Sequence, residues 1–488
     1  MNNNNTYVAL VLLFVMPCVL LAEEELPAPQ GFDESFEQTV PVAEKIANEV
    51  ATYIPQAASG APTEEQLVEE FNRYRGLIAE GTLDEADIAA KRIVEMAIKV
   101  YGPKSRETAS SLNNLGIVQH RNGQYNYAIQ NFASAVEIIE SAEDRLNSAL
   151  VNPLKGLGAA QLSIGRPDQA RATLDRAAHI TQVNNGPHNI GQVEILESIA
   201  EAHIRMNDMK SARKTIDRIH ILNVNFFEED PIGLLPSLFS RAEWQHRAGF
   251  YAEERLTYRR AIHTIEASLG KNSPMLVEPL RRLGETYYFI DMSMATPSQQ
   301  GLISTGEGYF RRSARIAEQS TEIDWHDSTR SRVALADYYN FTDAQNRAKK
   351  VYRSTWEYLS DNEERLATRS ELFSAPTPIQ VNVLPTFAGG GPGDGSDAEE
   401  LLNGKIVVEY NVSAKGRIRN VKTGAIPPEF TDMQRMVHRE IRSRIFRPRL
   451  LEGETVATKG LVFEHEFNYF QSDLEAIRES LAMAEKDE

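Results

Sequence analysis

The chain has 488 residues and a formal net charge of −17, from 52 lysines and arginines against 69 aspartates and glutamates. This acidic balance argues against a nucleic-acid-binding protein, because phosphate binding requires a basic surface. The length is sufficient for two or three domains. The single cysteine, Cys18, lies in an N-terminal apolar segment, so the rest of the chain offers neither a disulfide nor a thiol nucleophile.

Residues 1–22 have the pattern of an export signal. A largely apolar run of 16 residues begins at Tyr7, which is short for a membrane-spanning helix and typical of a signal-peptide core. Ala22 supplies the small residue needed before a cleavage site. Because no lysine or arginine precedes the apolar run, an uncleaved membrane anchor remains the alternative.

Residues 23–66 start as an acidic, proline-rich leader and continue with a helical periodicity from Val40 to Tyr53. We interpret this helix as a cap that shields the end of a repeat array, as solenoid ends require.

Residues 67–373 repeat a helical hairpin. In the clearest copy, Thr108 to Glu140, two amphipathic helices meet at Asn122-Gly123. Successive steps of 42 residues from Gly116 reach a small residue in each later copy: Gly158, Ala200, Ala242 and Gly284. The equivalent small residue of the seventh copy is Ala336. The larger residue of the second helix recurs as Phe132, Leu174, Ile216 and Tyr258. We expect about seven hairpins, with the small residues buried between paired helices.

This pattern of small and large residues resembles the tetratricopeptide repeat family. The resemblance implies a concave face, lined by first-helix positions, that binds peptides. The candidate groove residues are Asn113, Ile117, His120, Arg121, Lys155, Arg205, His246 and Arg247. Because these residues are mixed in charge and lack the lysine and asparagine pattern of the carboxylate-binding members, a solvated face without a dedicated peptide ligand is the alternative.

Residues 374–403 form a proline- and glycine-rich linker, in which Pro378 to Phe387 is expected to be extended. The periodicity then changes from helical to strand-like, and residues 404–470 read as two strands, a helix opened by a Thr431/Gln434 capping box, and a last strand. Residues 471–488 read as an acidic helical tail. The predicted fold is therefore mainly α: an α-solenoid followed by a small α+β (β-β-α-β) domain.

The second domain resembles the C-terminal domain of the TonB family. The resemblance depends on the order of elements, the sequence GKIVVEYNVSAKGRIRNV, Phe430, Phe446-Arg447-Pro448 and the Gly453-Glu454 turn. It implies that the last strand, Gly460 to Phe470, accepts an extended segment of an outer-membrane receptor as an added strand. The candidate edge residues are Leu461, Val462, Phe463, Glu464, His465, Glu466 and Phe467. Pro378 to Phe387 could instead fold back and occupy this edge.

A basic cluster distinguishes this domain from the acidic chain around it. Its candidate residues are Arg435, Arg439, Arg442 and Arg444, with Arg447 and Arg449 following. Such a single-sign patch could face a protein partner, an acidic lipid or the solenoid of the same chain.

No catalytic, cofactor or metal site can be identified, because the histidines have no metal-ligand spacing and no nucleophile triad or phosphate loop is present. We therefore expect a non-enzymatic protein-binding protein. The export signal and the resemblance to the TonB family imply a place in the periplasm of a Gram-negative bacterium and a role accessory to TonB-type energised transport. Its expected partners are outer-membrane receptor segments or TonB-system subunits, with membrane association through them or through an uncleaved N-terminus. The long proline-rich spacer of the TonB family is missing, which favours an accessory role over direct energy transduction. A scaffold for cell-envelope assembly is the alternative.

Overall fold

The computed structural model describes residues 62–289, 306–382, 384–385, 388 and 401–484. The predicted signal segment, the leader with its predicted Val40 to Tyr53 helix, and most of the glycine-rich linker lie outside these residues, as do residues 290–305. Within the described ranges, no helix is both long and apolar enough to cross a membrane.

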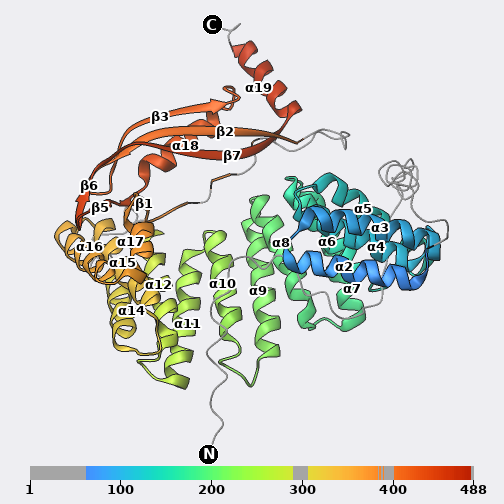
Figure 1. Cartoon of the computed structure of the whole chain (residues 1–488), viewed down its shortest axis with the longest axis horizontal. Coiled ribbons are helices and arrows are strands. Elements are labelled where there is room, and N and C mark those ends of the chain that lie inside the picture. Colours follow the sequence, from blue (N-terminus) through green and yellow to red (C-terminus); the bar gives the residue numbers. More distant parts are fainter. Residues whose placement is uncertain (1–61, 290–305, 383, 386–387, 389–400, 485–488) are drawn as a thin grey trace, which may run out of the picture. The chain divides into compact units, whose positions relative to one another are not determined.

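Helices in successive pairs make up most of the described chain (Figure 1). The pairs are α2 (Glu64–Glu80) with α3 (Leu83–Tyr101), α4 (Arg106–Arg121) with α5 (Tyr125–Ala142), α6 (Val151–Ser163) with α7 (Pro167–Asn185), α8 (Val193–Arg205) with α9 (Met209–Phe226), α10 (Leu235–Arg247) with α11 (Tyr251–Leu269), α12 (Val277–Glu285) with α14 (Glu307–Gln319), and α15 (Trp325–Phe341) with α16 (Gln345–Ser360). Helix α17 (Leu366–Phe373) follows. A helical-hairpin array, as predicted, is confirmed.

The chain divides into two compact units, residues 1–115 with 131–153, and residues 116–130 with 154–488. In the first unit, α2 starts at a capping box: the Thr63 hydroxyl accepts from the Gln66 amide, and the Gln66 side chain accepts from the Thr63 amide. Helix α3 packs on α2 through Ala86 and Ile93. Tyr74 of α2 is buried, and its hydroxyl donates to the Asn114 carbonyl at 3.3 Å.

In the second unit each helix from α7 to α17 packs on the next. The six predicted small positions, Gly116, Gly158, Ala200, Ala242, Gly284 and Ala336, are all buried. Close approach explains two of the glycines. A Cβ atom on Gly158 would lie 2.6 Å from Leu174 Cγ, and one on Gly284 would lie 2.7 Å from Phe310 Cε2. The repeat register is therefore confirmed by direct contact of the small and large residues.

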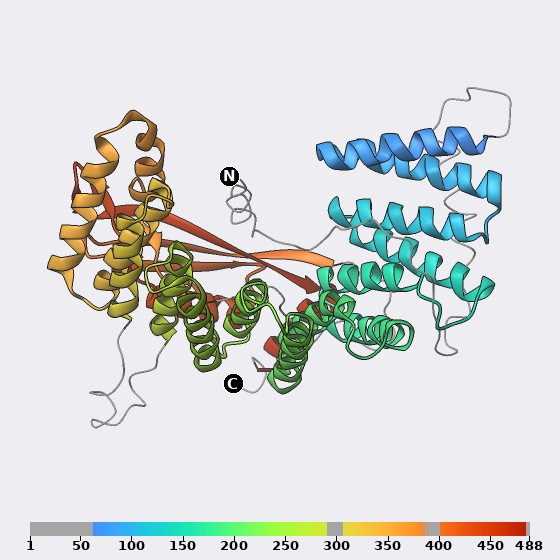
Figure 2. The ribbon, with the colours of Figure 1, turned by 90° about the horizontal axis from the view of Figure 1, so that it is seen from below.

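The C-terminal region of the second unit is a three-stranded antiparallel sheet with the order β3-β2-β7. Its strands are β2 (Leu401–Val412), β3 (Ile418–Ile426) and β7 (Thr458–Phe470), and α18 (Thr431–Ser443) packs on β2 and β3. Strands β2 and β7 run side by side in both views (Figures 1 and 2), in a register that pairs Leu401 with Phe470 and Tyr410 with Leu461.

The core of this region lies between the sheet and α18. It contains Ile406, Val408, Tyr410, Phe430, Val437, Ile441, Phe446, Phe467 and Tyr469. Two short ladders complete the region: β1 (Thr377–Pro378) with β4 (Phe446–Arg447), and β5 (Arg449–Leu451) with β6 (Glu454–Val456). The α+β region after the helical array is thus confirmed, and α19 (Gln471–Ala484) forms the helical tail.

The predicted capping box at the start of α18 is wrong. Thr431 is the first helical residue, and Phe430 occupies the N-cap without a side-chain hydrogen bond. The Gln434 side chain instead donates to the Thr423 carbonyl at 2.9 Å. Because Thr423 lies on β3, a tertiary contact replaces the local one.

Candidate functional site: protein-binding surfaces

The candidate edge residues lie consecutively on β7. The side chains of Phe467 and His465 are buried toward α18, whereas Val462, Glu464 and Glu466 are exposed on the opposite face. This is the period-two alternation expected of a half-buried strand. Within the described ranges β7 pairs with β2 on one side only, so its other side is an edge of the sheet.

We name the described residues 377–382, 384–385 and 388 the strap; they lie between the helical array and this edge. It begins as β1, and the Ile379 amide donates to the Ile445 carbonyl at 2.9 Å. The Asn382 amide and side chain then donate to the Glu440 carboxylate of α18 at 3.2 and 2.8 Å.

The far end of the strap contacts β7. His465 Nε2 donates to the Pro385 carbonyl at 2.8 Å, and the Ala388 amide donates to the Asn468 carbonyl at 2.9 Å. Leu384 and Ala388 also pack against the core beneath the sheet. The strap therefore occupies part of the β7 edge. Among its described residues, only those of β1 have strand conformation.

The predicted basic cluster does not form one patch. Arg435, Arg439 and Arg442 are exposed on α18. Arg444 is buried: its Nε donates to Glu440 at 3.3 Å, and its guanidinium lies 5.1 Å from the Phe463 ring centroid. Arg444 was therefore wrongly grouped, because α18 ends before it and the chain turns its side chain toward the sheet.

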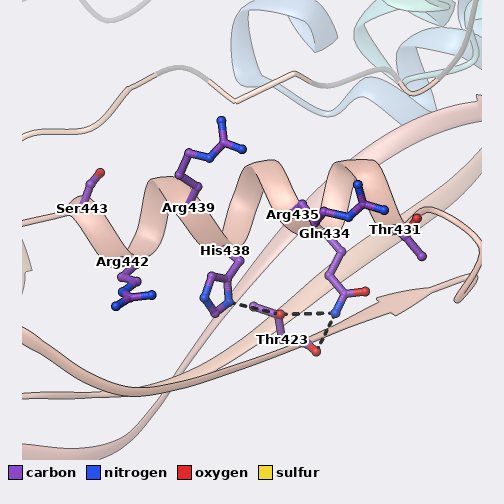
Figure 3. A pocket seen from close by; sticks show the side chains of 8 residues that line it. All are labelled: Thr423, Thr431, Gln434, Arg435, His438, Arg439, Arg442 and Ser443. Carbon is purple, nitrogen blue, oxygen red and sulfur yellow. Dashed lines mark hydrogen bonds between the residues drawn. The ribbon is translucent and has the colours of Figure 1, made fainter.

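The three exposed arginines border a hollow beside β3, shown in Figure 3. We name it the α18 groove; it has a volume of about 810 Å³ and is lined by Thr423, Thr431, Gln434, Arg435, His438, Arg439, Arg442 and Ser443. Gln434 and His438 point toward Thr423 in the figure, and His438 Nδ1 lies 3.4 Å from the Thr423 hydroxyl.

Arg447 attaches the C-terminal sheet region to the last hairpin. It forms a bidentate ion pair with Asp337 of α15, and Tyr352 of α16 donates to the same carboxylate at 2.7 Å. Burial by itself would lower the pKa of Arg447, but the adjacent Asp337 outweighs it and raises this pKa. Asn340 adds a hydrogen bond from its side-chain amide to the Phe446 carbonyl at 2.8 Å. This part of the basic cluster therefore serves docking within the chain.

Most candidate groove residues of the helical array bond to other helices of the array. His120 of α4 bonds Ser163 of α6 at 3.1 Å, and Lys155 of α6 bonds Glu194 of α8 at 2.6 Å.

The arginines at the ends of α8 and α10 share one carboxylate. Arg205 donates to Glu201 and to the Leu162 carbonyl, each at 2.7 Å, and Arg247 donates to the same Glu201.

His246 pairs with Glu254 of α11 at 3.1 Å, and this hydrogen bond raises the pKa of His246. Asn113, Ile117 and Arg121 are half-buried. The His246 bond joins the two helices of one hairpin, whereas the bonds of His120, Lys155, Arg205 and Arg247 link neighbouring repeats. Together they favour the interpretation of a solvated structural face.

Several residues of these surfaces were missed from the sequence. Gln434 and His438 are four residues apart, so the sequence could have predicted that they share a helix face. Their neighbour Thr423 comes from another element and could not be predicted in this way. Asp337 had no local signal, since its partner is 110 residues away. Across the described residues, no group of three or more His, Cys, Asp or Glu side chains is placed to hold a metal ion.

One segment of the helical array matches a known family model. Residues 76–141 match the sequence profile described as tetratricopeptide repeat. No curated protein matches the chain.

Similar solved structures include the nearly identical TPR-like repeats of a kinesin light chain from Podosopora anserina, at 15% identity and a TM-score of 0.38, covering 42% of this chain and 97% of that one. The apo form of RapI is 12% identical with a TM-score of 0.36, covering 62% and 99%. Aspartyl phosphate phosphatase F from Bacillus subtilis is 12% identical with a TM-score of 0.35, covering 65% and 92%. At these scores the likeness carries no functional argument.

Proposed function

We propose that this tetratricopeptide repeat protein is a non-enzymatic, exported interaction protein whose C-terminal region captures an extended partner segment by strand addition at β7. The observation that carries the proposal is that β7, with 13 residues, has a strand neighbour on one side only among the residues that the structure describes. The resemblance of residues 404–470 to TonB C-terminal domains points to a segment of an outer-membrane receptor as the partner. The protein would then act in the periplasm of a Gram-negative bacterium, accessory to TonB-type energised transport.

The direction of the backbone groups on β7 supports this edge. The Asn468 carbonyl accepts from Ala388, so the backbone groups of Asn468 point away from β2. In an antiparallel strand these directions alternate by residue, so the N–H and C=O groups of Val462, Glu464 and Glu466 also point outward. A partner strand can therefore pair with them without disturbing the ladder to β2.

The strap limits how far a partner strand can extend. It meets β7 at His465 and Asn468, next to the outward-pointing groups of Glu464 and Glu466. A segment that pairs along the whole edge must displace Ala388, whereas a shorter one can pair around Val462 with the strap in place. The strap therefore competes with the partner for the β7 edge. A small number of hydrogen bonds sets the free energy needed to displace it.

A scaffold for cell-envelope assembly, without a role in transport, is the second candidate. The Asp337–Arg447 ion pair favours it, because this contact holds the C-terminal region on the last hairpin. A scaffold needs fixed spacing between its binding surfaces. A domain that transmits motion to a distant receptor must instead be able to move relative to the helical array.

Site-specific photo-crosslinking of the full chain separates the two candidates. A crosslinking amino acid at Val462 reports on the β7 edge, and the same group at the exposed Lys350 of α16, away from both sheet edges, is the control. We expect position 462 to capture outer-membrane receptors, and substitution Glu466→Pro to abolish capture by removing one outward N–H, while Glu466→Gln preserves it. Capture of envelope-assembly subunits alone would support the scaffold, and equal capture from both positions would overturn strand addition.

Export is tested separately. If residues 1–22 are a signal peptide, the mature chain begins at Glu23, which mass spectrometry of the purified protein will show. An intact Met1 in the membrane fraction would instead support the anchor.

A further inference from the structure

We propose that the α18 groove is a second protein-binding site, which takes an extended acidic segment of a partner protein. The groove lies beside β3, whereas the strap and the candidate strand-addition edge lie along β7 at the other side of β2. This inference goes beyond the proposed function and does not depend on it.

The charge of the groove selects an anion. Its eight lining residues include three arginines and a histidine, but no aspartate or glutamate. Arg435 pairs at 3.1 Å with Asp432, and both side chains are largely exposed. Arg439 and Arg442 have no ion-pair partner among the described residues.

The acidic side chain nearest in sequence to these two arginines is committed elsewhere. Glu440 lies on the same helix, but its carboxylate accepts from Asn382 and from Arg444. The positive charge of Arg439 and Arg442 is therefore available to a ligand.

The spacing of the arginines suits an extended polypeptide. Along α18, Arg435 and Arg439 are separated by about 6 Å and Arg439 and Arg442 by about 4.5 Å, at about 1.5 Å per residue. Side chains on one face of an extended chain repeat every 6.6–6.8 Å or so, at about 3.3 Å per residue. Two or three carboxylates on alternate residues of a segment can therefore reach successive arginines, and guanidinium–carboxylate pairs are strong when bidentate.

The polar groups on the β3 side suit a peptide backbone. The Thr423 hydroxyl and the imidazole of His438 lie at the wall of the groove, and both can hydrogen-bond to peptide groups. In the part of the chain that the structure describes, β3 pairs with β2 alone and is thus itself an edge strand. An extended segment laid along the boundary of α18 and β3 thus meets the arginines of the helix and the hydrogen-bonding groups of Thr423 and His438.

A short acidic segment fits these observations better than an anionic membrane. The site is a hollow beside a helix, and a flat lipid surface cannot enter it as a single chain can. The chain carries −17 overall, which opposes approach to a negatively charged surface. A short segment experiences mainly the local field of the arginines, because charges more than about 10 Å away are screened by salt.

Fluorescence anisotropy with the full chain tests the proposal. The probe is a labelled peptide, Gly-Asp-Thr-Asp-Thr-Asp-Gly, and the control peptide has asparagine in place of each aspartate. The variant Arg439→Gln/Arg442→Gln changes two exposed side chains, and Lys349→Gln/Lys350→Gln on α16 is matched in charge change and exposure.

We expect saturable binding of the acidic peptide that weakens with rising ionic strength, a loss of roughly tenfold in the arginine variant and little change in the lysine variant. Equal loss in both variants, equal binding of the neutral peptide, or no binding of the acidic peptide would overturn the proposal. Binding of anionic phospholipid vesicles or inorganic phosphate in place of the acidic peptide would overturn the choice of a polypeptide ligand.

Discussion

Arg447 and Asp337 form an almost buried, bidentate ion pair between the C-terminal sheet region and α15. Arg447 Nε lies 3.0 Å from Asp337 Oδ1, and Arg447 Nη2 lies 2.7 Å from Asp337 Oδ2. The two side chains are only 12% and 9% exposed. Removal of one member of such a pair by substitution is strongly destabilising, because the remaining charge is then buried without its counter-charge. The Phe446-Arg447-Pro448 motif therefore has a docking role in this protein.

Substitution Arg447→Met is expected to lower the free energy of unfolding of the full chain by about 3–5 kcal/mol, since Asp337 then stays buried and unpaired. The double variant Arg447→Met/Asp337→Leu should recover much of this loss. Urea unfolding followed by circular dichroism measures both. The exposed Arg442→Met serves as the control, and a cost for Arg447→Met no larger than that control would contradict the docking role.

Substitution Gly158→Leu is expected to cost roughly 1–3 kcal/mol, because even a Cβ atom there would lie 2.6 Å from Leu174 Cγ. The control is Gly76→Leu on the exposed side of α2, where no atom lies within 4 Å of the added Cβ. Thermal melts of the two variants give the comparison. Full tolerance of leucine at position 158 would be incompatible with the repeat register.

Protonation of His220 is expected to lower the free energy of unfolding at acidic pH. Burial, with the nearby Arg241 and Arg260, lowers its pKa from 6.5 to about 4. Arg260 can only donate, and it does so to His220 Nε2 at 3.2 Å, which requires the neutral imidazole. Because the folded pKa lies below the unfolded one, stability is retained above pH 6.5 and falls as the pH drops from 6.5 toward about 4.

The pH dependence of urea unfolding checks this sign. The variant His220→Gln has no titrating group at this position, so its stability should fall less between pH 6.5 and about 4 than that of the natural chain. Parallel curves for the two proteins would show that His220 does not titrate in this range.

Substitution Ala388→Pro is expected to release the end of the strap, because it removes the amide that donates to Asn468. One hydrogen bond contributes about 0.5–1.5 kcal/mol, so overall stability should change little. Hydrogen exchange of peptides covering residues 377–388 should become faster, and His465→Ala should act in the same direction. Ala388→Ser keeps the amide and is the control; exchange in Ala388→Pro equal to that control would rule out the contact as a restraint.

Local periodicity accounts for how well the helical array could be predicted. Each hairpin buries one face, so small residues such as Gly158 and large ones such as Leu174 must recur at a constant spacing, and that spacing is visible in the chain. The strand alternation around Phe467 is visible for the same reason. The Thr431/Gln434 capping box was also a local pattern, but Gln434 found a better acceptor in Thr423 across the fold.

The amino-acid sequence by itself determined the helices of the array, α18 and the three long strands, and which of their faces are buried, because those choices depend on neighbours within a few turns. The short ladders β1–β4 and β5–β6 were not predicted. Only the tertiary structure decided what the charged residues do. Arg442 and Arg444 are two positions apart and chemically identical, yet one lines an open groove and the other is buried on Glu440 and Phe463. Arg447 needed Asp337 from a distant helix, and the strap needed His465 and Asn468. The physical reason is that a charge is stabilised by whichever partner the fold brings within a few ångströms. The periodicity of the local sequence does not specify that partner.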